Sequence, residues 1–96
     1  MGKEYYLRCL EMNEKFYKDT IIFSGSINQC REQYWYHVNR LFNLKTEGLT
    51  DLIAELQSRP GIVIDEIGCE YKYFKEVEGK DEKVPFKIKY YITEKS

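Results

Sequence analysis

Residue types that often carry chemistry are scarce in this chain of 96 residues. It has one histidine, His37, and three cysteines, none of which belongs to a CxxC pair. A metal site built from several histidines is therefore impossible, and odd, widely spaced cysteines predict neither a disulfide framework nor a zinc site. We expect Cys9, Cys30 and Cys69 to be reduced thiols that act mostly as small buried hydrophobic side chains. The sequence predicts no metal and no cofactor.

Positive and negative charges nearly balance, because the chain has 15 basic and 16 acidic residues and a net charge of −1. A protein dedicated to duplex nucleic acid normally carries a basic surplus on its binding face, and mimicry of nucleic acid needs an excess of carboxylates. No apolar run approaches the length of a membrane span. The N-terminal MGKEYY has no apolar signal region, and Tyr6 stands where a myristoylation motif needs Ser or Thr. We expect a cytoplasmic protein without a membrane partner.

Catalytic constellations are missing as well. Cys30 and His37 lie seven positions apart on an expected helix, about 10 Å along its axis, which is too far for direct proton transfer. No glycine-rich stretch has the spacing of a known phosphate-binding loop. We therefore expect that the protein is not an enzyme. A third hypothesis, an enzyme or a small-molecule binder, would need a cleft between the sheet and the helices.

Aromatic rings, by contrast, are plentiful. Nine tyrosines, five phenylalanines and one tryptophan stand against two methionines and one alanine. Each ring can bury about 150–250 Å², so a few of them can anchor the core of a small domain. Tyrosine hydroxyls need a partner or water, which places several tyrosines at the margin of that core. The length suits one domain, and we expect it to span residues 1–96.

The first part of the chain predicts a β-hairpin. Residues 5–12 (YYLRCLEM) and 16–23 (FYKDTIIF) are rich in aromatic, apolar and β-branched side chains, and NEK at 13–15 can form the turn.

Two helices are expected next. Ser26 and Gln29 fit a capping box, in which each side chain satisfies a free backbone amide of the first helix. Apolar residues then recur at spacings of three and four, namely Ile27, Cys30, Tyr34, Val38 and Leu41. A shorter helix is expected from Thr50 to about Ser58, with Leu52, Ile53 and Leu56 on its apolar side, and the RPG at 59–61 stops it.

The last third predicts strands again. The apolar positions change parity between Ile64 and Ile67, which predicts a bulge or bend near 65–68. A charged turn is expected at 78–83. The segment 84–92 alternates, with Val84, Phe86, Ile88, Tyr90 and Ile92 on one face and Pro85, Lys87, Lys89 and Tyr91 on the other. Pro85 indicates an edge or the start of a strand.

The predicted fold class is α+β in the order β-β-α-α-β-β. We expect an antiparallel sheet of two hairpins with two helices packed on one face. The hairpins could join edge to edge or pack as separate ribbons, and the sequence leaves both arrangements open.

The helix at residues 27–42 carries four ring-bearing residues in a row, at 34–37. A helix turns by roughly 100° per residue, so Tyr34 can face the core only if Tyr36 faces solvent, with Trp35 and His37 at the flanks. Trp, Tyr and Arg are frequent anchors of protein interfaces. We therefore predict a partner-binding strip at Trp35, Tyr36 and Arg40. The alternative is that the 43–49 connection covers Trp35 and that Tyr36 is merely solvated.

A second surface is expected on the outer side of the sheet. Phe74 and Tyr91 would form a second partner-binding patch there. Lys72, Lys87 and Lys89 lie among these rings, a combination that can stack bases and neutralise phosphates. Glu70 and Glu76 share that side, and strands beside water often carry lysine for solubility, so a simply solvated face is the alternative.

The leading hypothesis is a small cytosolic protein–protein interaction module that occupies the surface of another protein. The alternative is a single-stranded nucleic-acid-binding module that uses the outer sheet face. An edge strand with exposed rings would also suit a homodimer. In general profile (compact, tyrosine-rich, near-neutral, without catalytic groups) the chain resembles the small inhibitors made by phages and mobile elements, anti-CRISPR proteins among them. This resemblance implies an inhibitory role and identifies no site residue.

Overall fold

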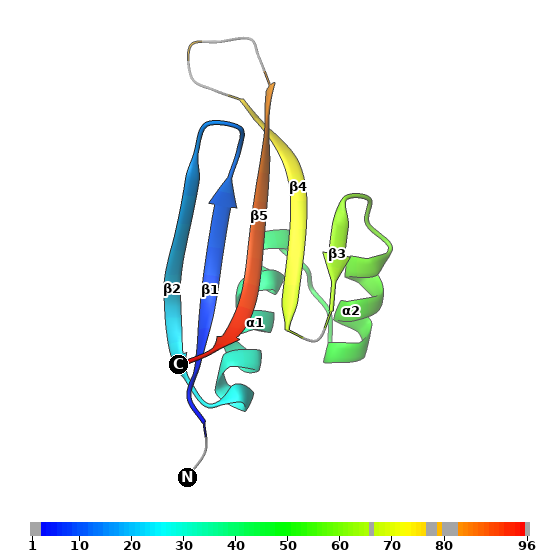
Figure 1. Ribbon diagram of the computed structural model, residues 1–96. Coiled ribbons are helices and arrows are strands. Elements are labelled where there is room, and N and C mark those ends of the chain that lie inside the picture. The colour runs from blue at the N-terminus through cyan, green and yellow to red at the C-terminus, as the bar shows by residue number, and fades with distance from the viewer. Residues whose placement is uncertain (1–2, 66, 77–78, 80–82, 96) are drawn as a thin grey trace.

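The computed structural model describes residues 3–65, 67–76, 79 and 83–95. It shows one five-stranded antiparallel sheet with two helices (Figure 1), which confirms the predicted α+β class. The elements are β1 (Tyr5–Met12), β2 (Tyr17–Gly25), α1 (Ile27–Phe42), α2 (Leu49–Gln57), β3 (Ile62–Ile64), β4 (Gly68–Glu76) and β5 (Lys83–Glu94). Among the described residues, neither helix combines the length and the apolar character needed to cross a membrane.

The sheet has the strand order β2-β1-β5-β4-β3. The two outer hairpins join edge to edge, because β1 pairs with β5 from Tyr5 opposite Glu94 to Met12 opposite Lys87. The first and last strands of the chain therefore lie side by side in the middle of the sheet (Figure 1).

Near residues 65–68, where the sequence predicts a bulge or bend within one strand, the chain turns back and so adds a fifth strand. The apolar run Ile62–Ile64 forms β3, and the chain then turns and returns as β4. In this turn the amide of Asp65 donates to the carbonyl of Gly68 at 2.8 Å, and Oδ1 of Asp65 accepts from the amide of Ile67 at 2.9 Å. The parity change in the sequence thus marks a turn between two paired strands. Residue 66, and most of the charged turn predicted at 78–83, lie outside the described residues.

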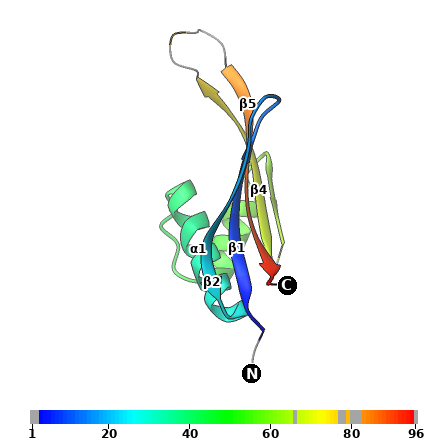
Figure 2. The same ribbon diagram turned by 60° about the vertical axis from the view of Figure 1, so that its left-hand side comes forward.

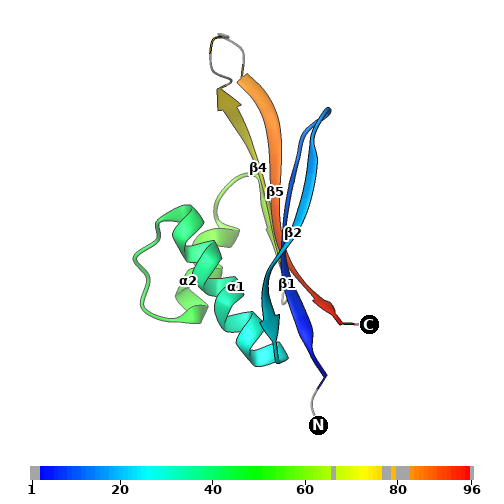
Figure 3. The ribbon, with the colours of Figure 1, turned by 90° about the vertical axis from the view of Figure 1, so that its left-hand side faces the viewer.

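α1 begins and is buried as its sequence predicts. Oγ of Ser26 accepts from the amide of Gln29 at 3.2 Å, and Oε1 of Gln29 accepts from the amide of Ser26 at 3.0 Å. Cys30, Tyr34 and Val38 are fully buried against the sheet. Leu41 was expected on the same stripe but is 38% exposed, because α1 diverges from the sheet toward its C-terminal end (Figures 2 and 3).

α2 packs on β3 at one edge of the sheet. Leu52 and Leu56 are buried, whereas Ile53 is only half-buried and borders an open space between the helices. The core lies between the sheet and the two helices. It consists of Leu7, Cys30, Tyr34, Val38, Leu52, Leu56, Cys69 and Ile92. All three cysteines are free, and Cys30 and Cys69 are buried as expected.

Both hairpins project beyond the helices, so that the ends of β1–β2 and β4–β5 stand clear of the helical layer (Figures 2 and 3). β5 also extends past β1, because Met12 at the end of β1 pairs with Lys87. Among the described residues, Pro85 therefore pairs only with β4, where it lies opposite Phe74. A proline is tolerated there because that side of β5 is an edge.

Candidate interaction surfaces

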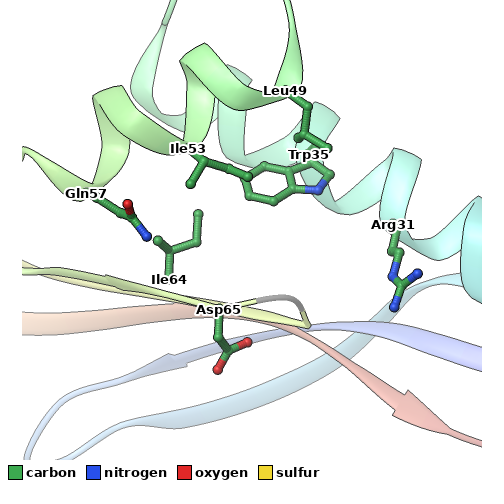
Figure 4. A pocket seen from close by; sticks show the side chains of 7 residues that line it. All are labelled: Arg31, Trp35, Leu49, Ile53, Gln57, Ile64 and Asp65. Carbon is green, nitrogen blue, oxygen red and sulfur yellow. The ribbon is translucent and has the colours of Figure 1, made fainter.

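A cleft of ≈ 420 Å³ lies between α1, α2 and the end of β3. We call it the Trp35 cleft. Its lining is largely apolar, with Arg31, Gln57 and Asp65 as the polar members; the apolar members are Trp35, Leu49, Ile53 and Ile64. Figure 4 shows Leu49 and Ile53 of α2 directed toward the indole of Trp35, with Ile64 of β3 on the opposite wall.

The position of Trp35 follows from the helical period. Tyr34 points at the sheet, so Trp35, about 100° further round the helix, points sideways toward α2. The two rings meet edge to face with centroids 4.7 Å apart, which restricts the indole. The indole does not fill the space between the two helices. The cleft that an enzyme or a small-molecule binder would need between sheet and helices is therefore present.

The predicted strip Trp35, Tyr36 and Arg40 is brought together on α1. Tyr36 is 54% exposed, and the guanidinium of Arg40 lies 5.8 Å from the centre of its ring. A shallower hollow of ≈ 280 Å³ lies on this side of Trp35, bounded by Tyr36, Asn39 and Thr46 among others. The 43–49 connection therefore flanks Trp35 without sealing it, and it leaves Tyr36 open to solvent.

His37 packs between two tyrosines. Its ring lies 5.5 Å from that of Tyr36 and is stacked 5.8 Å from that of Tyr90. Burial and the nearby Arg40 lower the pKa of the imidazole below its usual value. His37 is therefore mostly neutral at neutral pH and acts here as an aromatic packing residue.

The second predicted surface is spread along β4 and β5 on the outer face of the sheet. In the β4–β5 register, Lys72 lies opposite Lys87, Glu70 opposite Lys89, and Phe74 opposite Pro85. Phe74 is 70% exposed. Tyr91 lies six residues from Pro85 along β5, about 20 Å away at the rise of a strand. Phe74 and Tyr91 share a face but do not form one patch.

Tyr91 is held in place by neighbouring strands. Its hydroxyl donates to the carboxylate of Asp19, the guanidinium of Arg8 lies 5.8 Å from its ring centre, and Nζ of Lys89 lies 5.1 Å from it. Burial, followed by this hydrogen bond, raises the pKa of Tyr91 to about 12. Arg8 and Asp19 were missed from the sequence, because only the pairing of β1 with β5 brings them to Tyr91.

A further cleft of ≈ 370 Å³ lies where the two hairpins separate. We call it the hairpin cleft. Its lining includes residues 12–14 at the end of β1, Lys72–Phe74 of β4 and Pro85–Lys87 of β5. The outer-face lysines differ in their partners: Nζ of Lys87 lies 3.4 Å from Oε1 of Glu70, whereas Lys72 has no ion pair within the described part of the chain.

Among the described residues, no three His, Cys, Asp or Glu side chains gather closely enough to hold a metal ion. Comparison with known proteins yields no match to a family model, a curated protein or a solved structure. The function is therefore inferred from the surfaces of the molecule itself.

Proposed function

We propose that the protein binds another protein through the Trp35 cleft and works by occupying that partner's surface. One observation supports this above the others: the cleft leaves an apolar space of ≈ 420 Å³ open to solvent beside the core. Protein interiors are normally close-packed, and exposed apolar area is unfavourable by about 25 cal/mol per Å². A partner side chain that fills the cleft would remove this area from water.

The surroundings of the cleft favour a protein as the occupant. Leu49 is 50% exposed at its rim, and Ile67, in the turn after β3, is 47% exposed. Tyr36 and Arg40 extend the surface along α1. Tryptophan, tyrosine and arginine are the residues that most often dominate binding energy at interfaces, and here all three types are neighbours on one helix.

The charge at the rim indicates what the partner carries. Arg31 makes no ion pair within the described part of the chain, although it lines the cleft together with Trp35. We expect the partner to insert apolar side chains between α1 and α2 and to place a carboxylate near Arg31. Such a segment would be amphipathic.

The first experiment tests whether the protein captures a partner protein. The tagged protein is incubated with lysate of its native host, and the retained proteins are identified by mass spectrometry. In a double variant, Tyr36→Ala with Arg40→Ala, we expect the specific partner to be lost while the melting temperature stays nearly unchanged, because both side chains are exposed. A matched control is Val63→Ala, which truncates a side chain that is 67% exposed on β3.

Binding in the cleft itself is then measured with the purified partner. Trp35 is the only tryptophan of the chain, so its emission reports on the cleft without labelling. We expect a blue shift on addition of a tryptophan-free fragment of the partner and a weaker response in Ile53→Ser. The proposal would be contradicted if the double variant captured the partner as well as wild type does and the partner fragment did not change Trp35 emission. A shift caused by the low-molecular-mass fraction of the lysate would indicate a small-molecule site instead.

A further inference from the structure

The hairpin cleft exists because the sheet divides near one end. β1 ends at Met12, opposite Lys87, while β5 continues toward Lys83 with only β4 beside it in the described chain. This region lies beyond the helical layer (Figures 2 and 3). Its side chains are therefore not needed to cover the core.

Two lysines stand directly opposite each other beside this cleft. Lys72 of β4 pairs in register with Lys87 of β5, and like charges in directly opposite positions destabilise a sheet. Glu70 relieves only part of this repulsion, through its contact with Lys87. Lys89 follows on the same face of β5. Glu14 at the other wall keeps the local positive surplus small. An anion that met Lys72 and Lys87 together would remove the repulsion that the fold leaves in place.

A flat apolar surface lies next to these lysines. Phe74 lies opposite Pro85 and is 70% exposed. Every nucleic-acid base can stack on such a ring, whatever its identity, provided that the base is unpaired. A lysine pair beside an exposed ring therefore matches a base and its phosphates better than it matches a free anion.

We propose that the hairpin cleft binds single-stranded nucleic acid, with a base stacked on Phe74 and phosphates at Lys72 and Lys87. This site is separate from the Trp35 cleft and shares no lining residue with it. The two sites can therefore be occupied together, and each proposal stands or falls without the other. Because the cleft offers few positive charges, the affinity is weak, and two phosphate contacts give a slope of about −1.4 in log K against log salt concentration.

The experiment is fluorescence anisotropy with labelled oligo-dT and oligo-U of about ten nucleotides, at about 50 and about 200 mM salt. We expect binding at the lower salt that weakens by about sevenfold at the higher one, as two phosphate contacts predict. Phe74→Ala should weaken binding by about tenfold through lost stacking, and Lys72→Ala should weaken it and reduce the salt slope by about 0.7. Both substitutions lie outside the core, so circular dichroism should show an unchanged fold.

The matched control is Lys18→Ala, which removes the same charge from an exposed position on β2 that does not line the cleft. It should change the affinity by less than about twofold. An equal loss in Lys18→Ala and Lys72→Ala would overturn the proposal in favour of diffuse electrostatic attraction. Absence of binding at low salt, full binding by Phe74→Ala, or equally tight binding of a duplex would also overturn it. If Phe74→Ala instead abolished capture of a protein, the cleft would be a protein contact.

Discussion

The hydroxyl of Tyr91 on β5 donates a hydrogen bond to Oδ2 of Asp19 on β2, across the strand that separates them. That strand is β1, and its Arg8 contributes Nε to the other carboxylate oxygen at 3.1 Å. One carboxylate thus joins three neighbouring strands on the outer face of the sheet. The Asp19 side chain is only 14% exposed and that of Arg8 is 34% exposed, so water can replace these bonds only in part.

Asp19→Ala should therefore be clearly destabilising. The substitution leaves the Arg8 guanidinium and the Tyr91 hydroxyl without their acceptor, and we expect the free energy of unfolding to fall by about 1–3 kcal/mol. Urea denaturation followed by circular dichroism measures this change. Glu4→Ala provides the comparison, because its ion pair with Lys95 is exposed and should contribute less than about 1 kcal/mol. Equal effects of the two substitutions would contradict the role assigned to Asp19.

Alkaline pH should weaken the same contact. A folded-state pKa of about 12, raised above the ordinary value of 10.0, means that the folded chain holds the Tyr91 proton more tightly than the unfolded chain does. The associated stability is fully present below pH 10 and is lost as pH rises through about 12. Wild type should thus exceed Tyr91→Phe in stability near pH 8, and the gap should narrow between about pH 10 and about pH 12.

Other buried tyrosines require a control when wild type and Tyr91→Phe are compared by denaturation at several pH values. Burial raises the pKa of Tyr90 to about 12 and raises that of Tyr34 as well. Wild type and Tyr91→Phe should therefore both lose stability at alkaline pH. Only the narrowing of the difference between their free energies of unfolding reports on Tyr91. A gap that stays constant up to about pH 12 would show that the hydroxyl of Tyr91 does not donate to Asp19.

Much of the fold could be predicted because its sequence signals are local. The capping box at Ser26, the helical spacing that buries Tyr34 and the alternation that buries Ile88 each depend on residues close together in the chain. The pairing of β1 with β5 could not be predicted in this way. It joins segments separated by most of the chain, and packing of the whole sheet against the helices decides which edges meet.

The candidate sites also differ in whether local sequence predicts them. The exposure of Tyr36 follows from a rotation of about 200° relative to Tyr34, so the sequence predicts it. The Trp35 cleft depends on the angle at which α1 diverges from the sheet and on the position of α2 on β3. No local sequence pattern predicts this angle or this position. The contacts of Tyr91, which the sequence predicts as a partner-binding residue, could not be predicted either, because Arg8 on β1 and Asp19 on β2 are far away in sequence.

The hydroxyl of Tyr34 should contribute little to stability. The side chain is fully buried, and its hydroxyl has only the thiol of Cys69, a weak hydrogen-bond partner, beside it. Tyr34→Phe removes a polar group whose loss of hydration this contact compensates poorly, so we expect stability to stay equal or to rise by up to about 1 kcal/mol. Tyr34→Ala should instead cost about 3–5 kcal/mol through the cavity it creates. A loss of more than about 1 kcal/mol in Tyr34→Phe would reveal a hidden partner such as a buried water.

We expect the protein to self-associate through β2 rather than through β3. β2 is a nine-residue edge strand that no described element covers on its outer side (Figure 1), and Tyr17, Ile21 and Ile22 on it are 67%, 49% and 36% exposed. β3, the opposite edge, has three residues and packs against α2. Long apolar edges pair readily with a second strand, and natural proteins protect them with charges. Light scattering should therefore show concentration-dependent association that Ile22→Lys reduces and Val63→Lys on β3 does not. Equal effects of the two lysines would mean that general charge, and not the β2 edge, controls association.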